Sequence, residues 1–140
     1  MPPFLFFSKC NKCDFRTSIS TGSVPYVRDE NGNKVRCSQP GEQDTIADVL
    51  KISRDVVGAW DRDKDKVPEE VRKKIEDNVG MMLQHICLEC LSETFLDLKR
   101  EKLKCSSCGS ENLMYATELE SKLCPKCKVG IIKRIDQGIV

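Results

Sequence analysis

The chain has 140 residues, the length of one ordinary domain or two small ones, and nine of them are cysteine. Apolar residues make up 39% and aromatic residues 6%, which is lean for a single core, so part of the stability must have another source. The 23 Lys and Arg nearly balance the 22 Asp and Glu, and the formal charge of +1 predicts no general attraction to nucleic acid or acidic membranes.

The apolar start of the sequence, residues 4–7, is too short to be a targeting or membrane segment. It has no basic segment before it, and Lys9 follows before a secretory h-region of ~7 to 15 residues is complete. Elsewhere, no window approaches the ~18 apolar residues of a membrane helix. We therefore expect a cytoplasmic protein without a membrane partner. Disulfides are rare in that compartment, so clustered cysteines there are more often metal ligands or redox groups.

Residues 1–40 are the first of three expected regions, an N-terminal β-hairpin region with one Cys-x-x-Cys turn, here called a knuckle. The apolar start leads to Cys10 and Cys13. Two strand-like segments within residues 24–36 then flank an Asp-Glu-Asn-Gly-Asn turn, in which Asn-Gly tolerates positive φ. This pattern predicts a β-hairpin.

Residues 41–80 are the second region, a helical insert without cysteine that carries eleven acids and eight bases. Apolar residues recur at helical spacing over 46–60 and predict one amphipathic helix of about four turns, with Asp44 as its N-cap. After a charged connector, Pro68 and two glutamates predict the start of a second helix, which continues to Gly80.

Residues 81–140 are the third region, a C-terminal region with three knuckles, which we expect to form a zinc ribbon on the grounds given below. The first two knuckles, at 87–90 and 105–108, are separated by fourteen residues that include a strand-like segment. At ~3.3 Å per residue, this gap is long enough for an antiparallel hairpin to return the second knuckle beside the first. Gly109 stands where a knuckle needs a residue that tolerates positive φ.

Eight of the nine cysteines form four Cys-x-x-Cys pairs, numbered first to fourth in chain order: Cys10 and Cys13, Cys87 and Cys90, Cys105 and Cys108, and Cys124 and Cys127. A tight turn at this spacing aims two thiolates at one point, and two such turns complete a tetrahedron around zinc. The four pairs therefore predict two Zn²⁺ ions, each held by four cysteines. A thioredoxin-like redox pair would need its first cysteine at a helix N-terminus within a βαβ unit, which none of the pairs has.

The four pairs can be combined in two ways. We favour a site made by the second and third pairs and another made by the first and fourth, which brings the ends of the chain together. The alternative joins the first pair to the second and the third to the fourth, across a gap of fifteen residues that is equally feasible.

Residues 85–110 resemble a zinc ribbon, with C-x-x-C, a nearby Phe, a hairpin and a closing C-x-x-C-G-S. Together with the first knuckle, the helical insert and the segment 124–130, the layout resembles small bacterial double zinc-ribbon proteins. The expected fold is α+β: small, metal-stabilised zinc-ribbon-type β-hairpins with an inserted helical pair. Zinc ribbons serve transcription, translation, nucleic-acid enzymes and protein docking, so the resemblance implies a metal-bound scaffold without selecting one role.

Two bound zinc ions would change both the stability and the charge. Zinc binding of ~10 to 16 kcal/mol per structural site is comparable with the folding stability of a domain, which would account for the lean core. Eight thiolates and two Zn²⁺ change the formal charge from +1 to −3.

The sequence contains no visible catalytic machinery. It has no phosphate-binding Gly-rich loop, nucleophile elbow or spaced carboxylate pair, and a four-cysteine site leaves no open position on zinc for water. We expect no enzyme and no small-molecule substrate. We expect instead a protein-interaction or regulatory module whose partner is a protein that binds the helical pair near Trp60.

Two alternatives remain open. Bases exceed acids near both ends, with five bases against Asp136 alone over residues 121–140, and Phe15 and Tyr26 are aromatic, so a nucleic-acid-binding accessory factor is the first alternative. The same lysines would also suit a solvated surface that offsets the thiolate charge. A rubredoxin-like iron electron carrier is the second alternative.

Cys37 and His85 stand outside the four pairs. We expect Cys37 to be a semi-buried thiol after the hairpin and His85 to pack beside the ribbon. A Cys-His pair, or a mixed site with the first cysteine pair, is the competing interpretation.

Overall fold

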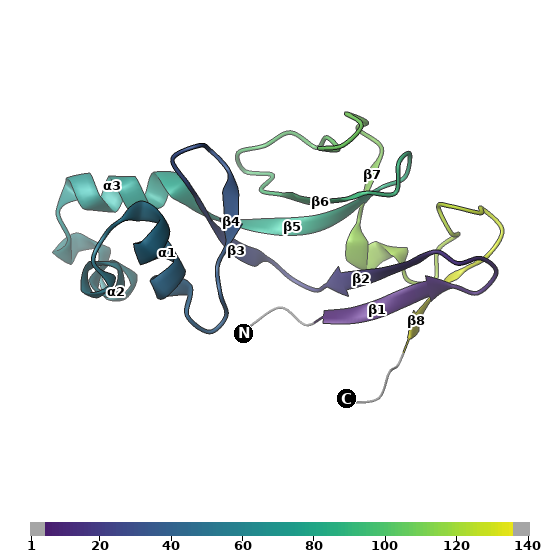
Figure 1. The fold of residues 1–140 in the computed structure, drawn as a ribbon, viewed down its shortest axis with the longest axis horizontal. Helices are drawn as coiled ribbons and strands as arrows, with labels where there is room; N and C mark the ends of the chain where they lie inside the picture. The colour runs from purple at the N-terminus through teal and green to yellow at the C-terminus, as the bar shows by residue number, and fades with distance from the viewer. Residues whose placement is uncertain (1–4, 136–140) are drawn as a thin grey trace. The chain divides into compact units, whose positions relative to one another are not determined.

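The computed structural model describes residues 5–135, which form two compact units (Figure 1). Among these residues, one unit contains 5–23 and 83–135, and the other is Val24–Met82. Phe4 and Asp136, named above, lie outside the described residues. Within the described range, no helix has the length and apolar character needed to cross a membrane.

The first unit contains a three-stranded antiparallel sheet of order β2-β1-β8. Its strands are β1 (Leu5–Cys10), β2 (Arg16–Ser20) and β8 (Ile132–Ile135). The first knuckle is the turn between β1 and β2, where the amide of Cys10 donates to the carbonyl of Phe15 at 2.9 Å. Side chains alternate along β1, so Phe6, Ser8 and Cys10 are buried while Phe7 and Lys9 are exposed.

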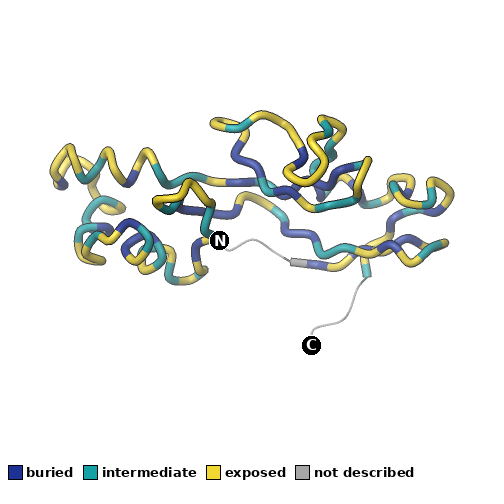
Figure 2. Tube along the Cα trace, turned by 45° about the horizontal axis from the view of Figure 1, so that its top comes forward, coloured by how far each residue is buried: buried dark blue, intermediate teal, exposed yellow. Residues whose placement is uncertain are grey.

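The ribbon part of the first unit is built on the C-terminal half of β5. Strand β5 (Val79–Cys87) pairs antiparallel with β6 (Glu93–Leu96) and with β7 (Leu113–Tyr115). The second knuckle is the turn between β5 and β6, and the short helix η2 (Ala116–Leu119) follows β7. The long loop between β6 and β7, which carries the third knuckle, is mostly exposed (Figure 2).

The second unit contains the hairpin that the sequence predicts. Strands β3 (Val24–Arg28) and β4 (Lys34–Arg36) pair antiparallel. In the turn, the Asp29 carboxylate accepts hydrogen bonds from the amides of Asn31 and Asn33, both at 2.9 Å, and Gly32 has a φ of 83°. Strand β3 also pairs with Val79–Met82 of β5, so the strand order in this unit is β4-β3-β5.

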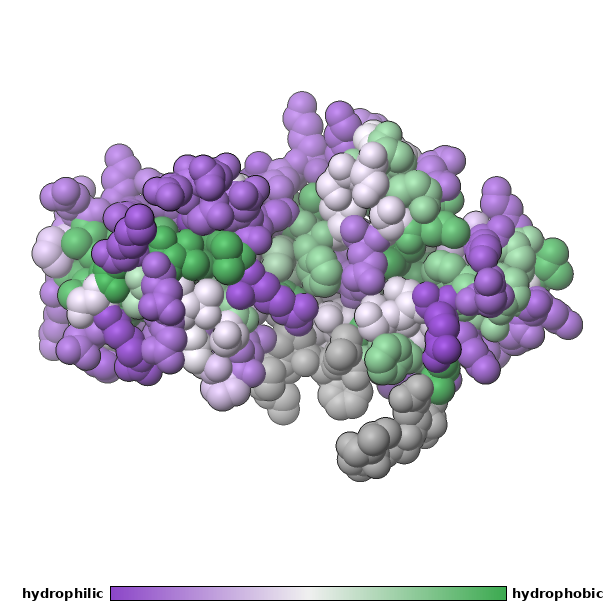
Figure 3. All heavy atoms as spheres, in the orientation of Figure 1, coloured by the Kyte–Doolittle hydropathy of each residue, from purple (hydrophilic) through white to green (hydrophobic). Residues whose placement is uncertain are grey.

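The helices of this unit are α1 (Glu42–Leu50), α2 (Arg54–Arg62) and α3 (Glu69–Asn78), with a short 3₁₀ turn at Lys64–Lys66. On the face drawn in Figure 3, hydrophilic side chains predominate over their outer surface and hydrophobic ones show between them.

The predicted single helix over 46–60 is wrong, because the chain breaks between α1 and α2. Lys51 adopts a left-handed φ of 57°, and the Ser53 hydroxyl accepts a hydrogen bond from the Asp55 amide, which caps α2. The predicted N-cap, Asp44, is also wrong: α1 begins at Glu42, and Asp44 lies in its first turn. Apolar residues keep their helical spacing across the break, so the periodicity of the sequence does not reveal it.

The second predicted helix is confirmed at its start and ends earlier than expected. Pro68 is the N-cap of α3, which ends at Asn78. Val79 and Gly80 are already paired with β3 as the beginning of β5. The hydrogen bonds of the sheet therefore decide the helix end, which local pattern alone does not reveal.

Each unit has its own core. The core of the first unit consists of Phe6, Cys10, Phe15, Ile19, Ile86, Ala116, Leu119, Cys124 and Ile132. The core of the second unit consists of Val27, Cys37, Ile46, Ala47, Leu50, Val57 and Ile75. The β3–β4 hairpin and the helices thus share one core, although our expected regions assigned the hairpin to 1–40 and the helices to 41–80. The α+β class is confirmed, with two sheets and three α-helices among the described residues.

Candidate metal centres

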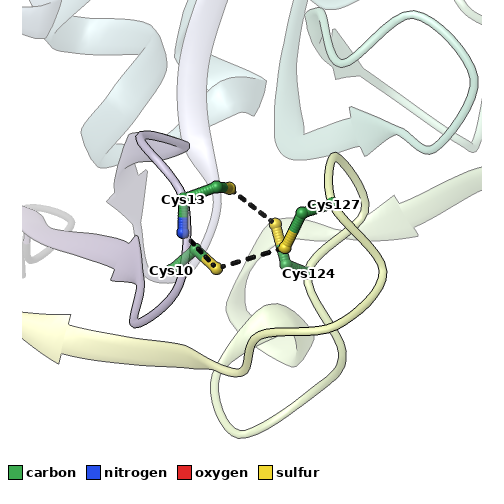
Figure 4. A group of neighbouring side chains, drawn as sticks. All are labelled: Cys10, Cys13, Cys124 and Cys127. Carbon is green, nitrogen blue, oxygen red and sulfur yellow. Dashed lines mark hydrogen bonds between the residues drawn. The ribbon is translucent and has the colours of Figure 1, made fainter.

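The first and fourth cysteine pairs meet in one cluster, here called the terminal site (Figure 4). Cys10 ends β1, Cys13 lies in the following turn, and Cys124 and Cys127 form the turn that precedes β8. The Sγ atoms of Cys10 and Cys127 are 3.6 Å apart, and those of Cys13 and Cys124 are 3.7 Å apart. Residues separated by more than a hundred positions are therefore brought within reach of one ion.

The second and third pairs meet in a second cluster, here called the ribbon site. The Sγ atoms of Cys87 and Cys108 are 3.6 Å apart, and those of Cys90 and Cys105 are 3.5 Å apart. The pairing that we favoured from the sequence is confirmed, because each cluster contains the two pairs that it predicts.

The sulfur spacing in both clusters fits a tetrahedral ion. Four sulfurs at ~2.3 Å from a central Zn²⁺ lie roughly 3.8 Å from one another. The four sulfur–sulfur distances given above, 3.5 to 3.7 Å, are close to this value, and in each cluster all four sulfurs lie within 4.8 Å of one another. Each cluster can thus hold one metal ion, and all its ligand positions are then occupied by sulfur.

Backbone amides point at the sulfurs in all four knuckles. In each first cysteine, the Sγ accepts from the amide two residues later: Lys12 to Cys10 at 3.2 Å, and Glu89 to Cys87, Ser107 to Cys105 and Lys126 to Cys124 at 3.4 Å. N–H dipoles directed at sulfur stabilise the thiolate form, which is the form that binds metal. The knuckle geometry thus supports metal binding before any ion is present.

Three of the knuckles share one backbone conformation. The residue after the second cysteine has positive φ: 68° at Leu91, 78° at Gly109 and 59° at Lys128. In each, this residue's amide donates to the carbonyl of the first cysteine, at 2.9 to 3.0 Å. Sequence reasoning found Gly109 and missed Leu91 and Lys128, because only glycine signals positive φ by its identity.

Gly130 lets the two knuckles of the terminal site approach each other. A Cβ at this position would lie 2.3 Å from the Sγ of Cys10 and 2.9 Å from Asn11 Oδ1. Asn11 Oδ1 accepts from the backbone amide of Ile131 at 3.0 Å, and the backbone amide of Asn11 donates to the Ile131 carbonyl at 3.1 Å. Sequence analysis missed both roles; the glycine three residues after Cys127 was the only available signal.

Neighbouring sulfurs oppose the simultaneous ionisation of all four cysteines of the terminal site, as the pKa of Cys13 shows. Amides of Gly130 and Val129 lower the pKa of Cys127 to about 6. For Cys13 the Phe15 amide lowers the pKa, but burial and the neighbouring sulfurs outweigh it and raise the value to about 12. A divalent ion removes this conflict by supplying positive charge among the sulfurs.

The ribbon site also combines one cysteine whose pKa is lowered with one whose pKa is raised. The Cys108 amide is the main cause that lowers the pKa of Cys105 to about 6. The Ser110 amide lowers the pKa of Cys108, but burial and the other three sulfurs raise it to about 12. In both clusters the neighbouring sulfurs thus oppose the loss of a proton from one cysteine, and a bound cation would favour it.

The two sites differ in exposure. In both, the first cysteine of each pair is buried. The second cysteines, Cys13 and Cys127, are half-buried in the terminal site, whereas Cys90 and Cys108 of the ribbon site are exposed. The terminal site also belongs to the core of its unit through Cys10 and Cys124. It is therefore the better shielded of the two.

Cys37 and His85 belong to neither cluster among the described residues. Cys37 is 3% exposed in the core of the second unit, and burial, followed by the charge of Glu42, raises its pKa to about 11. His85 is buried, its Nδ1 lies 3.0 Å from the carbonyl of Leu83, and its ring packs edge-on against Tyr115 at 5.9 Å. Both have the packing roles that we expected.

Phe15 and Tyr26, the aromatic residues considered for base stacking, are buried. Phe15 belongs to the core of the first unit, and Tyr26 has no exposed surface within the second. Neither presents an open ring face, so the expectation that these two residues stack bases is wrong. Both rings are instead packed in the protein interior, Tyr26 on β3 and Phe15 just before β2.

Comparison with known proteins adds no further assignment. The chain matches no protein-family model, no curated protein and no solved structure. The two four-cysteine clusters are compatible with zinc-ribbon-like sites, and the geometry of the sites alone supports a metal-binding role.

Proposed function

We propose that this chain is a non-enzymatic zinc-binding protein with two structural four-cysteine sites, which acts as a protein-interaction module. The observation that carries the proposal is the spacing of the eight sulfurs, at 3.5 to 3.7 Å across both clusters. Four sulfur ligands leave no position for a water nucleophile, which favours a structural ion over a catalytic one. Cysteines can bind a metal only while they are not oxidised to disulfides, and the cytosol keeps thiols reduced. We therefore propose that the protein is cytoplasmic.

Zinc is the metal we propose, with iron as the second candidate. Tetrahedral four-thiolate sites accept either ion. The terminal site is continuous with the core through Cys10 and Cys124, and a d¹⁰ ion without redox chemistry suits a site on which packing depends.

Native mass spectrometry with metal analysis tests this part of the proposal. We expect two zinc ions per chain and a colourless protein; a red protein that contains iron would contradict the zinc assignment. A double Cys124→Ser, Cys127→Ser variant should retain one ion and leave Cys10 and Cys13 open to alkylation. Cys37→Ser, which removes a cysteine outside both sites, is the control and should retain two ions.

The surface that we propose for a protein partner is a groove in the second unit, with a volume of about 510 Å³. Its lining includes Trp60, Met81 and Pro25. Met81 is 51% exposed, and Trp60 Nε1 is buried without a hydrogen-bond partner among the described residues. An apolar side chain of a partner would match the exposed Met81 in this groove.

A comparison of two charge insertions tests the groove. Met81→Lys should remove partners that the wild-type chain captures from nuclease-treated lysate, because a lysine there puts a charge into an apolar contact. Leu98→Lys replaces another exposed apolar residue, in the first unit, and should leave these partners bound. Partners that survive Met81→Lys would contradict the groove, and partners that disappear with nuclease alone would be held through nucleic acid.

A further inference from the structure

A row of three cations crosses the exposed face of the sheet β2-β1-β8. Lys9 of β1 lies directly opposite Arg16 of β2 and opposite Lys133 of β8. Directly paired residues project to the same face of a sheet, and all three are exposed. Because neighbouring strands are about 4.8 Å apart, this cation row places three positive charges across roughly 10 Å.

The cation row is not neutralised within the structure. Like charges directly opposite one another destabilise a sheet. The ion pairs given for residues 5–135 involve Arg54, Arg72, Lys126 and Arg134, and none involves a member of the row. Glu93 lines a cavity together with Arg16, but its carboxylate accepts from Gln84 Nε2 at 3.0 Å and forms no ion pair with Arg16. Three like charges in one row, without an ion pair among residues 5–135, favour an anion supplied by another molecule.

The row does not serve the thiolates of the terminal site. Cys10 follows Phe6 and Ser8 on the buried face of β1, whereas Lys9 projects to the opposite face. The lysine at the terminal site is Lys126, which forms an ion pair with Asp14 across the two knuckles. Neutralisation of the metal site therefore does not account for the row.

An exposed aromatic ring lies in the next row of the same face. Phe7 is 40% exposed, between Ser18 on β2 and Ile135 on β8. A cavity of about 470 Å³ opens beside it, lined by apolar Phe7, Phe15 and Leu91 and by polar side chains that include Arg16 and Glu93. Phe7 and Arg16 both line the cavity, so the exposed ring and the cation row lie next to the same opening.

We propose that this face binds single-stranded nucleic acid, with successive phosphates on the cation row and one base against Phe7 at the mouth of the cavity. Cations that follow a backbone, together with an aromatic side chain for the bases, are the elements of single-strand binding. An acidic peptide would use the cations and leave the ring and cavity without a planar partner. A membrane surface would likewise not require a cavity beside the ring.

The salt dependence of binding to a short fluorescein-labelled oligothymidylate tests the row. Three neutralised phosphates predict a log–log slope of about −2, or roughly a 20-fold loss of affinity between about 50 and 200 mM salt. Each of Lys9→Gln, Arg16→Gln and Lys133→Gln should reduce the slope by about 0.7. The matched control combines Lys73→Gln, Lys74→Gln and Lys102→Gln, three exposed lysines outside the sheet, and should leave the slope unchanged.

Two variants of Phe7 test the stacking contact separately. Phe7→Ala should weaken binding roughly 5- to 150-fold without a change in the salt slope, because a stacked base is lost and no phosphate contact is. Phe7→Trp should retain the affinity. Every variant is first checked for two bound metal ions, so that weakened binding cannot result from a lost site.

Three results would overturn the proposal. The first is the absence of oligonucleotide binding at low salt. The second is equal binding by the triple control and by a variant that combines Lys9→Gln, Arg16→Gln and Lys133→Gln. The third is equal binding of polyphosphate or phosphatidylglycerol vesicles without dependence on Phe7. The last result would identify a general anion surface. If the protein contained no zinc but still bound the oligonucleotide in a Phe7-dependent way, only the metal assignment would be contradicted.

Discussion

Replacing Gly130 by alanine should weaken the terminal site and leave the ribbon site intact. The new Cβ would lie 2.3 Å from the Sγ of Cys10, more than 1 Å inside the ordinary contact distance of roughly 3.5 Å. It would also lie 2.9 Å from the Cβ of Lys12, so neither neighbour offers open space. The knuckles would have to separate, and the four sulfurs would no longer fit one tetrahedron.

Overpacking of this kind costs about 1 to 3 kcal/mol, which corresponds to roughly 5- to 150-fold weaker zinc binding at one of the two sites. Competition with a chromophoric chelator measures the two affinities, and native mass spectrometry counts the ions that remain. Gly58→Ala is the matched control, because its Cβ would meet only the ends of the Arg62 and Gln43 side chains at 3.4 Å. An alanine at 130 that left both affinities at their wild-type values would refute the close-approach argument.

Three further predictions concern the cysteines. Limited chelation should empty the ribbon site first, because Cys90 and Cys108 are exposed; pulsed alkylation with mass spectrometry reads the order, and equal labelling of both sites would contradict it. In the chelated protein, Cys37 should react far more slowly than the other eight, because burial is the main cause that raises its pKa to about 11; rapid labelling would show that the second unit has opened. Zinc affinity should fall as the pH falls, since Cys13 and Cys108, with pKa values of about 12, must lose protons to bind. The fall should steepen below about pH 6, where Cys105 and Cys127 are also protonated, and a chelator titration independent of pH would oppose this linkage.

The knuckles were predictable because their information is local. Two cysteines three positions apart, in a turn whose amides face the sulfurs, need only a few consecutive residues to form. The hairpin around Asp29 and Gly32 was predictable for the same reason, since turn chemistry is encoded within five residues. The break at Lys51 was not, because lysine carries no sequence signal for a left-handed φ.

Contacts between distant residues account for the remaining differences. Gly80 continues a helical pattern in the sequence, but pairing with Tyr26 of β3 places it in a strand. Phe7 and Phe15 have the same side chain, so their identity does not predict which of them is buried. Phe15 is buried because it belongs to the core of the first unit, whereas Phe7 is exposed because it projects from the opposite face of β1 to the core residue Phe6. Sheet register likewise aligns Lys9 with Arg16 and Lys133, which lie up to 124 positions apart in the sequence.

Spacing and turn chemistry within short segments were enough to predict the α+β class, the four Cys-x-x-Cys turns and the hairpin between β3 and β4. The tertiary structure decided which pairs meet, why Gly130 must lack a side chain and which face carries the cation row. These features depend on strand register and on the close approach of the first and last knuckles, and both are set by packing between residues far apart in the chain.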